Sequence, residues 1–139
     1  KVIPWFRKYQ PRPGQTVCKG RWLQIVHGNK VCYAQWEDCG PFCTDDYKYV
    51  FGSSRPKNSK NNAAGIDLSP AVRDYLGFKS GAKVHWRFID FENVPKGAWS
   101  KYGTNNPFVN PAMDTDLLVK RRYMEYLRQQ RDRLHRKSS

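Results

Sequence analysis

Four cysteines, Cys18, Cys32, Cys39 and Cys43, lie within a stretch of 26 residues. Such a group either forms disulfides or binds zinc, and a structural zinc site normally takes two closely spaced pairs. Cys39 and Cys43 form one close pair, but Cys18 and Cys32 are 14 residues apart. The spacing therefore favours two disulfides, and zinc held in part by the close pair is the alternative. We expect no bound metal and no cofactor.

Four cysteines allow three pairings, and the sequence alone does not choose among them. We favour Cys18–Cys32 with Cys39–Cys43, because the Gly-Pro pair inside the second ring can turn tightly enough to close it. Cys18–Cys39 is the alternative, since a hairpin that turns at Gly28-Asn29 would place those two residues opposite each other. Two disulfides imply an oxidising compartment, so we predict a periplasmic or secreted protein of bacterial type.

Motifs for two common kinds of enzyme are missing. The sequence contains neither GxxxxGK[ST] nor GxGxxG, the loops that hold nucleotide phosphates. His27 falls in a predicted turn, His85 in a predicted strand and His135 in the C-terminal tail, and none lies near a nucleophile elbow. The sequence thus argues against a nucleotide-dependent enzyme and against a Ser-His-Asp hydrolase.

Short strands and turns are predicted over most of the chain. Gly-Asn between two β-rich runs predicts a hairpin from residues 16–26 and 31–36. Residues 65–68 suggest a short strand, and alternation over residues 82–90 predicts another, with Val84, Trp86 and Phe88 on one face. The run from residue 51 to 64 is rich in Ser, Asn, Gly, Pro and Lys, which is typical of a long surface loop.

Two helices are predicted. Ser69 is a good N-cap before Pro70, and Gly77 is a good terminator, so residues 71–76 should form a short helix. The tail should be helical from Asp114, with a modest apolar stripe. The stripe comprises Val119, Tyr123, Leu127 and Leu134.

Composition excludes two classes of protein. The chain has 139 residues, of which 14% are aromatic, too many for a disordered protein. No apolar run approaches the roughly 20 residues of a membrane span. The formal net charge is +13, and the basic excess occurs both in the tail and in the rest of the chain. Such a charge favours polyanionic partners, including anionic wall polymers, acidic membrane surfaces and nucleic acid.

Two segments carry a family resemblance. Residues 36–42 are Trp-Glu-Asp-Cys-Gly-Pro-Phe, and residues 65–72 are Gly-Ile-Asp-Leu-Ser-Pro-Ala-Val, followed by Tyr75-Leu76-Gly77. Together with residues 81–88, they resemble the double-psi β-barrel family, which includes RlpA-like septal wall proteins, barwin and the first domain of expansins. The resemblance implies a mainly β fold, a six-stranded double-psi β-barrel at residues 14–111. An aromatic, Pro-rich lead-in (1–13) and a basic C-terminal helix (112–139) would flank the barrel.

The resemblance also implies chemistry on β-linked glycans. Asp67 matches the Asp of the family's Ile-Asp-Leu-Ser and would act as general acid and then base, as in a lytic transglycosylase. Asp38 matches the Asp of the Gly-Pro-Phe loop and would position substrate or raise the pKa of Asp67. Two carboxylates flanking a cleft would also permit glycoside hydrolysis. Equally, both could hold backbone amides in place. Cys39 stands where the family usually has Arg.

The sequence also suggests further site residues and binding partners. Four aromatic residues are candidates for stacking on sugar rings or for core packing; they are Tyr47, Tyr49, Phe51 and Trp99. We expect a protein that binds peptidoglycan-like glycan or another polyanionic polymer and cleaves it with Asp67; the alternative is a non-catalytic wall-binding or assembly module. The C-terminal helix is a candidate contact to other subunits. The sequence argues against nucleic-acid binding, because only the charge favours it.

Overall fold

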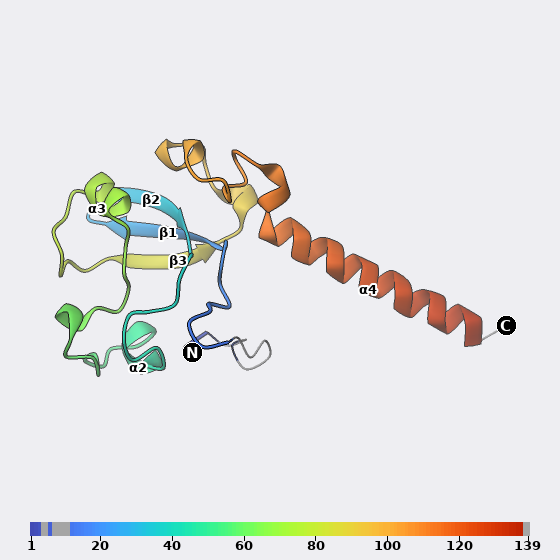
Figure 1. The fold of residues 1–139 in the computed structure, drawn as a ribbon, viewed down its shortest axis with the longest axis horizontal. Coiled ribbons are helices and arrows are strands. Elements are labelled where there is room, and N and C mark those ends of the chain that lie inside the picture. Colours follow the sequence, from blue (N-terminus) through green and yellow to red (C-terminus); the bar gives the residue numbers. More distant parts are fainter. Residues whose placement is uncertain (4–5, 7–11, 138–139) are drawn as a thin grey trace.

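The computed structural model describes residues 1–3, 6 and 12–137. Three strands, β1 (Trp22–His27), β2 (Lys30–Gln35) and β3 (His85–Ile89), form one open sheet in the order β2-β1-β3, and both pairings are antiparallel. Short helices and 3-10 turns surround the sheet, and a long helix, α4 (Thr115–Lys137), extends away from it (Figure 1). The described part of the chain is therefore a small mixed α/β domain.

The predicted six-stranded double-psi β-barrel is wrong. Residues 65–68, predicted as a strand, join no ladder, although Ile66 and Leu68 pack their side chains against the core. Residues 51–64 and 91–113 contain turns, coil and short 3-10 helices because they are rich in Pro, Gly, Asn and Ser, which interrupt strand pairing. β2 and β3 flank β1, and no other described strand pairs with their outer edges, so the sheet stays open.

The predicted hairpin is confirmed, although its first strand begins at Trp22 rather than at residue 16. β1 and β2 pair around a two-residue turn at Gly28 and Asn29, and Gly28 has a φ of 58°, a left-handed value that glycine adopts without a Cβ penalty. The strand predicted over residues 82–90 is also confirmed, over the shorter range His85–Ile89. Trp86 and Phe88 face the core as the alternation predicted.

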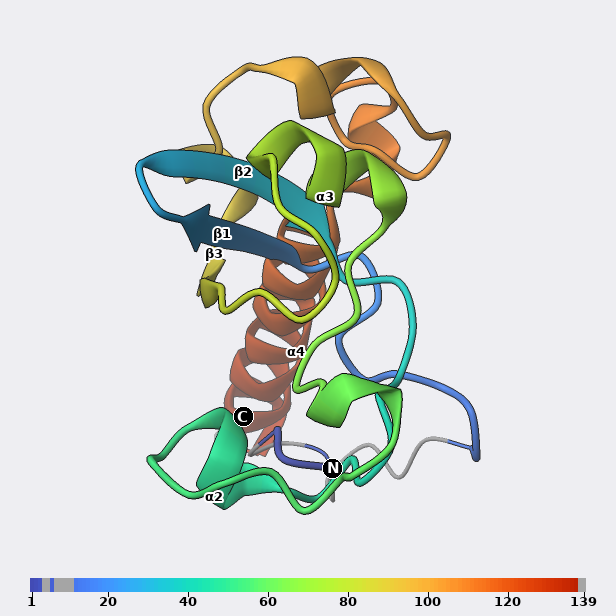
Figure 2. The same ribbon diagram turned by 90° about the vertical axis from the view of Figure 1, so that its left-hand side faces the viewer.

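The core lies on one face of the sheet. Leu23, Ile25, Cys32 and Leu76 are all buried and in contact. The register places Ile25 between Cys32 and Trp86, so the three strands contribute neighbouring side chains to this face. Leu76 comes from helix α3 (Pro70–Leu76), which packs beside β2 (Figure 2).

The local signals around α3 act as predicted. The Ser69 hydroxyl accepts a hydrogen bond from the Val72 N–H at 3.3 Å. Gly77 ends the helix with a φ of 75°, and its N–H donates to the carbonyls of Arg73 and Asp74. These two caps fix where the chain enters and leaves α3, and they place residues 64–69 directly before its first turn.

A second cluster covers the opposite face. Trp22, adjacent to Leu23 in β1, points away from the main core and contacts Phe91 and Phe108 with ring centroids 5.9 and 5.8 Å apart. Buried Asn106 organises the segment that carries Phe108. Its Nδ2 donates to the carbonyls of Trp99 and Tyr102, and its Oδ1 accepts from the Phe108 N–H at 3.0 Å.

The predictions for the two ends of the chain have different outcomes. Much of the predicted aromatic lead-in, including Trp5 and Tyr9, lies outside the described residues. The predicted C-terminal helix is confirmed as α4. None of the helices in the described part of the chain is both long enough and apolar enough to cross a membrane.

Candidate functional site

A cleft of about 460 Å³ lies beside the core face of the sheet. One wall is the loop after β2, residues 36–44, and the facing wall is the segment 64–69 that leads into α3. Leu23 and Ile25 form part of the floor, and residues 1–3 contribute to the rim. The volume falls in the range of natural small-molecule sites. Both segments that carry the family resemblance therefore line one cleft.

Asp67 is exposed at this cleft. Its Oδ1 accepts a hydrogen bond from Asn61 Nδ2 at 3.1 Å. A Cβ atom placed on Gly40 would lie 3.6 Å from Asp67 Oδ2, so the Gly-Pro-Phe loop passes directly beside this carboxylate. Asn61 lies in a short 3-10 turn (Asn61–Ala63) with a left-handed φ of 50°, which Asn tolerates better than most residues.

Asp38 lines the same cleft, but its hydrogen bonds are made within its own loop. Its Oδ1 accepts a hydrogen bond from the Cys39 N–H at 2.7 Å, and its carbonyl accepts from Trp36 Nε1 at 2.5 Å. These bonds hold the first turn of the loop after β2. The backbone role considered from the sequence therefore applies to one oxygen of Asp38.

The predicted aromatic residues divide into two groups. Tyr49, from the end of helix α2 (Tyr47–Val50), lines the cleft, and its ring lies against Gly65, where a Cβ atom would clash with it. Tyr47 and Phe51 are exposed outside the cleft lining. Trp99 lies elsewhere, against Tyr33 at a ring-centroid distance of 4.9 Å. Of the four, Tyr49 is the one that lines the cleft with the two carboxylates.

Sequence reasoning missed other aromatic residues of the cleft. Trp36 and Trp86 both line it, with ring centroids 5.8 Å apart in an edge-to-face arrangement. Phe42 of the Gly-Pro-Phe loop is 65% exposed and lines it as well. The strand alternation that predicted a core role for Trp86 contained no sign that its edge would border a cleft.

Two buried polar residues of the cleft wall were also missed. Asp46 is 5% exposed and accepts the Lys57 N–H at 2.8 Å. Asn58 is also 5% exposed; its Oδ1 accepts the Lys60 N–H at 2.9 Å, while its Nδ2 has no partner among the described residues. In the sequence, Asn58 is one of several similar Asn residues in a polar loop, so nothing distinguishes it there.

All four cysteines are free thiols in the structure, so neither predicted disulfide pairing is formed. Cys18 and Cys32 are buried, and burial raises the pKa of both thiols. Cys39 and Cys43 are exposed and line the cleft. The oxidising compartment was inferred from disulfides, and it therefore stays a prediction.

No group of three or more His, Cys, Asp and Glu side chains within residues 1–3, 6 and 12–137 is placed to hold a metal ion. In particular, the alternative of a zinc site built on Cys39 and Cys43 lacks further ligands among those residues. The cleft lining therefore combines the Asp67 carboxylate with several aromatic side chains.

No family model, curated protein or solved structure matches the chain.

Proposed function

We propose that the cleft binds a segment of β-linked, peptidoglycan-like glycan and that Asp67 acts on the bound glycosidic bond. The observation that carries the proposal is the meeting of Asp67 with Tyr49, Trp36 and Phe42 at one cleft. Aromatic faces pack on the apolar faces of sugar rings, while a carboxylate exchanges protons with glycosidic and hydroxyl oxygens.

The local geometry favours a mechanism with one carboxylate. Glycoside hydrolysis normally needs two carboxyl groups at a set separation, one of which activates water or attacks the sugar. Asp38 holds the backbone of its own loop through the Cys39 N–H, so we give it that structural role and assign the chemistry to Asp67. Protonated Asp67 would donate its proton to the glycosidic oxygen as the bond to the sugar C1 breaks. Its carboxylate would then accept the proton of the sugar's own 6-hydroxyl as that oxygen bonds to C1, which yields an anhydro sugar.

The test is incubation with purified peptidoglycan, followed by analysis of soluble products and of protein bound to the pellet. Asp67→Asn removes the acid with little change of shape. Asp90→Asn, an exposed residue outside the cleft, makes the same change of charge and is the control. We expect anhydro products from the wild type and from Asp90→Asn, and none from Asp67→Asn, with all three proteins bound. Fragment release by Asp67→Asn would rule out its role.

A non-catalytic binding module is the second candidate, favoured by the local use of Asp38. It predicts pellet binding by all three proteins without any products. Binding itself is tested at Phe42, whose ring is exposed at the cleft, against Tyr102, which is 76% exposed outside it. Phe42→Ala should weaken glycan binding by about 1 kcal/mol, the scale of one aromatic contact, whereas Tyr102→Ala should not. Absence of glycan binding by the wild type would refute both candidates.

A further inference from the structure

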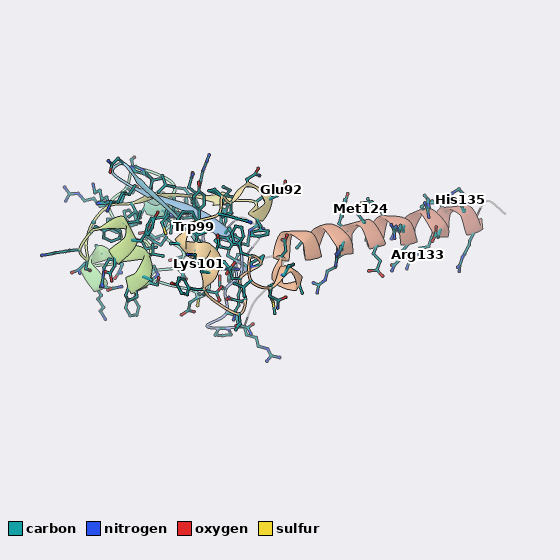
Figure 3. The ribbon with its side chains drawn as sticks, turned by 90° about the horizontal axis from the view of Figure 1, so that it is seen from above. Glu92, Trp99, Lys101, Met124, Arg133 and His135 are labelled. Carbon is teal, nitrogen blue, oxygen red and sulfur yellow. The ribbon has the colours of Figure 1, made fainter. Side chains whose placement is uncertain are left out.

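Helix α4 stands apart from the sheet, and most of its described side chains are exposed. It has 23 residues, which corresponds to a length of about 35 Å at the usual rise of an α-helix. Figure 1 shows it leaving the body of the molecule, with the C-terminus at its far end. In Figure 3 the side chains of α4 project into open space, including Met124, Arg133 and His135. Within the described structure, the helix is not covered by the sheet.

One side of α4 is apolar although it faces solvent. Tyr123 comes four residues after Val119, and Tyr126 and Leu127 come three and four residues after Tyr123, which places all four on one face of an α-helix. Their exposed fractions are 60%, 60%, 54% and 40%. Leu134, seven residues beyond Leu127, continues the face. Tyr126 thus joins the four residues predicted from the sequence, and we call these five residues the apolar stripe.

Arginines border the apolar stripe. Arg122 comes three residues after Val119 and four before Tyr126, so it lies along one edge. Arg131 comes four residues after Leu127, along the other edge, and pairs with Asp132 at 3.2 Å. The sequence of α4 contains eight Lys and Arg residues but only three Asp and Glu residues. The helix is therefore amphipathic and strongly basic.

Three kinds of partner would use these features differently. A second copy would bring two strongly positive helices together, and like charges oppose such a pairing. Nucleic acid would use the arginines but would leave the apolar stripe in water. An anionic lipid surface would use both, because a basic amphipathic helix buries its apolar face at the headgroup boundary while its cations meet anionic headgroups. Tyr rings suit that boundary, since they have an apolar body and a polar tip.

We propose that α4 binds the surface of anionic lipid membranes, with the apolar stripe inserted among the acyl chains near the headgroups and the flanking arginines on the lipid phosphates. The helix lies in the plane of the surface. The sheet and the cleft, carried at its N-terminal end, remain outside the bilayer. This inference is independent of the glycan proposal, because it uses no residue of the cleft.

The experiment is co-sedimentation of the full chain with vesicles of phosphatidylcholine alone or of phosphatidylcholine mixed with phosphatidylglycerol. Tyr123→Gln/Leu127→Gln removes the middle of the apolar stripe and keeps every charge. Met124→Gln is the control, because Met124 is 53% exposed and lies off the stripe, on the side of α4 that also carries His135 (Figure 3). Gln and Met have similar helix propensities. Circular dichroism shows whether the variants keep their helix content.

We expect the wild type and Met124→Gln to bind the anionic vesicles and to dissociate from them at high salt. Neither should bind vesicles of phosphatidylcholine alone. The double variant should bind at least about tenfold more weakly, the scale expected for burying one large apolar side chain. Equal binding by the double variant would overturn the proposal, as would failure of the wild type to bind at low salt. Binding to a DNA duplex that survives in the double variant, without vesicle binding, would assign α4 to nucleic acid. A dimer in light scattering that the double variant disrupts, again without vesicle binding, would assign it to a second copy.

Discussion

Asn61 donates a hydrogen bond from Nδ2 to Oδ1 of Asp67 over 3.1 Å, and this bond links the short turn before the cleft to the carboxylate on its wall. The two residues are six positions apart, in a stretch predicted as a loop followed by a short strand. The bond therefore restrains the side chain to which the proposed chemistry is assigned.

Removal of the Asn61 side chain should weaken the function of Asp67 without unfolding the turn. Asn61→Gly suits the left-handed φ of 50° at this position, so the variant loses the hydrogen bond but gains no backbone strain. One lost hydrogen bond of about 1 kcal/mol corresponds to about a fivefold fall in fragment release. Asn62→Gly is the matched control, with a φ of 53° and a side chain that bonds Ser80 instead. Equal rates for the two variants would refute the positioning role of Asn61.

A side chain at Gly65 should be destabilising, because the ring of Tyr49 lies in the space that a Cβ atom would take. We expect Gly65→Ala to lower the free energy of unfolding by about 1–3 kcal/mol, the usual cost of overpacking, as measured by urea titration. If the cost arises from this contact, it should shrink in a Tyr49→Ala background. A cost that is the same in both backgrounds would place its origin elsewhere.

The four thiols should differ in reactivity. Cys39 and Cys43 are exposed, whereas Cys18 and Cys32 are buried with a raised pKa, and the thiolate is the reactive form. A chromogenic disulfide reagent should therefore label Cys39 and Cys43 rapidly in the native, reduced protein. The other two should react only after unfolding in urea, and peptide mass mapping identifies the sites. Rapid native labelling of Cys18 would contradict the buried environment described above.

Stability should fall in mildly alkaline solution. Burial raises the pKa of the Cys18 and Cys32 thiols in the folded state above the ordinary value of about 8.5. Below that pH the thiols are neutral in both states, so the contribution to stability is complete. As the pH rises further, the unfolded chain ionises while the folded one resists, and the free energy of unfolding decreases until the folded pKa is passed.

The measurement is the urea unfolding midpoint as a function of pH, with a reducing agent present. Each of the two thiols contributes a slope of up to about 1.4 kcal/mol per pH unit. Cys32→Ala should therefore give a shallower decline than the wild type, even though its stability at neutral pH is lower. Parallel curves would show that Cys32 does not titrate differently in the two states.

The sequence by itself determined the local elements. Gly28-Asn29 specified the hairpin and its register, Ser69 and Gly77 specified the ends of α3, and alternation specified which face of β3 carries Trp86. These features depend on interactions within a few residues, or on one buried face. Short-range rules therefore predict them well.

Only the tertiary structure decided how the elements combine. Whether residues 65–68 pair as a strand depends on partners far along the chain, and there the prediction of a barrel was wrong. Which residues form the site also depends on contacts between distant segments. Asp46 and Asn58 line the cleft, whereas Trp99, predicted as a site residue, packs against Tyr33 outside it. The thiols, too, stay unpaired in this fold, two of them buried and two exposed. Burial and proximity are properties of the packed chain, and residue type and spacing contain only part of that information.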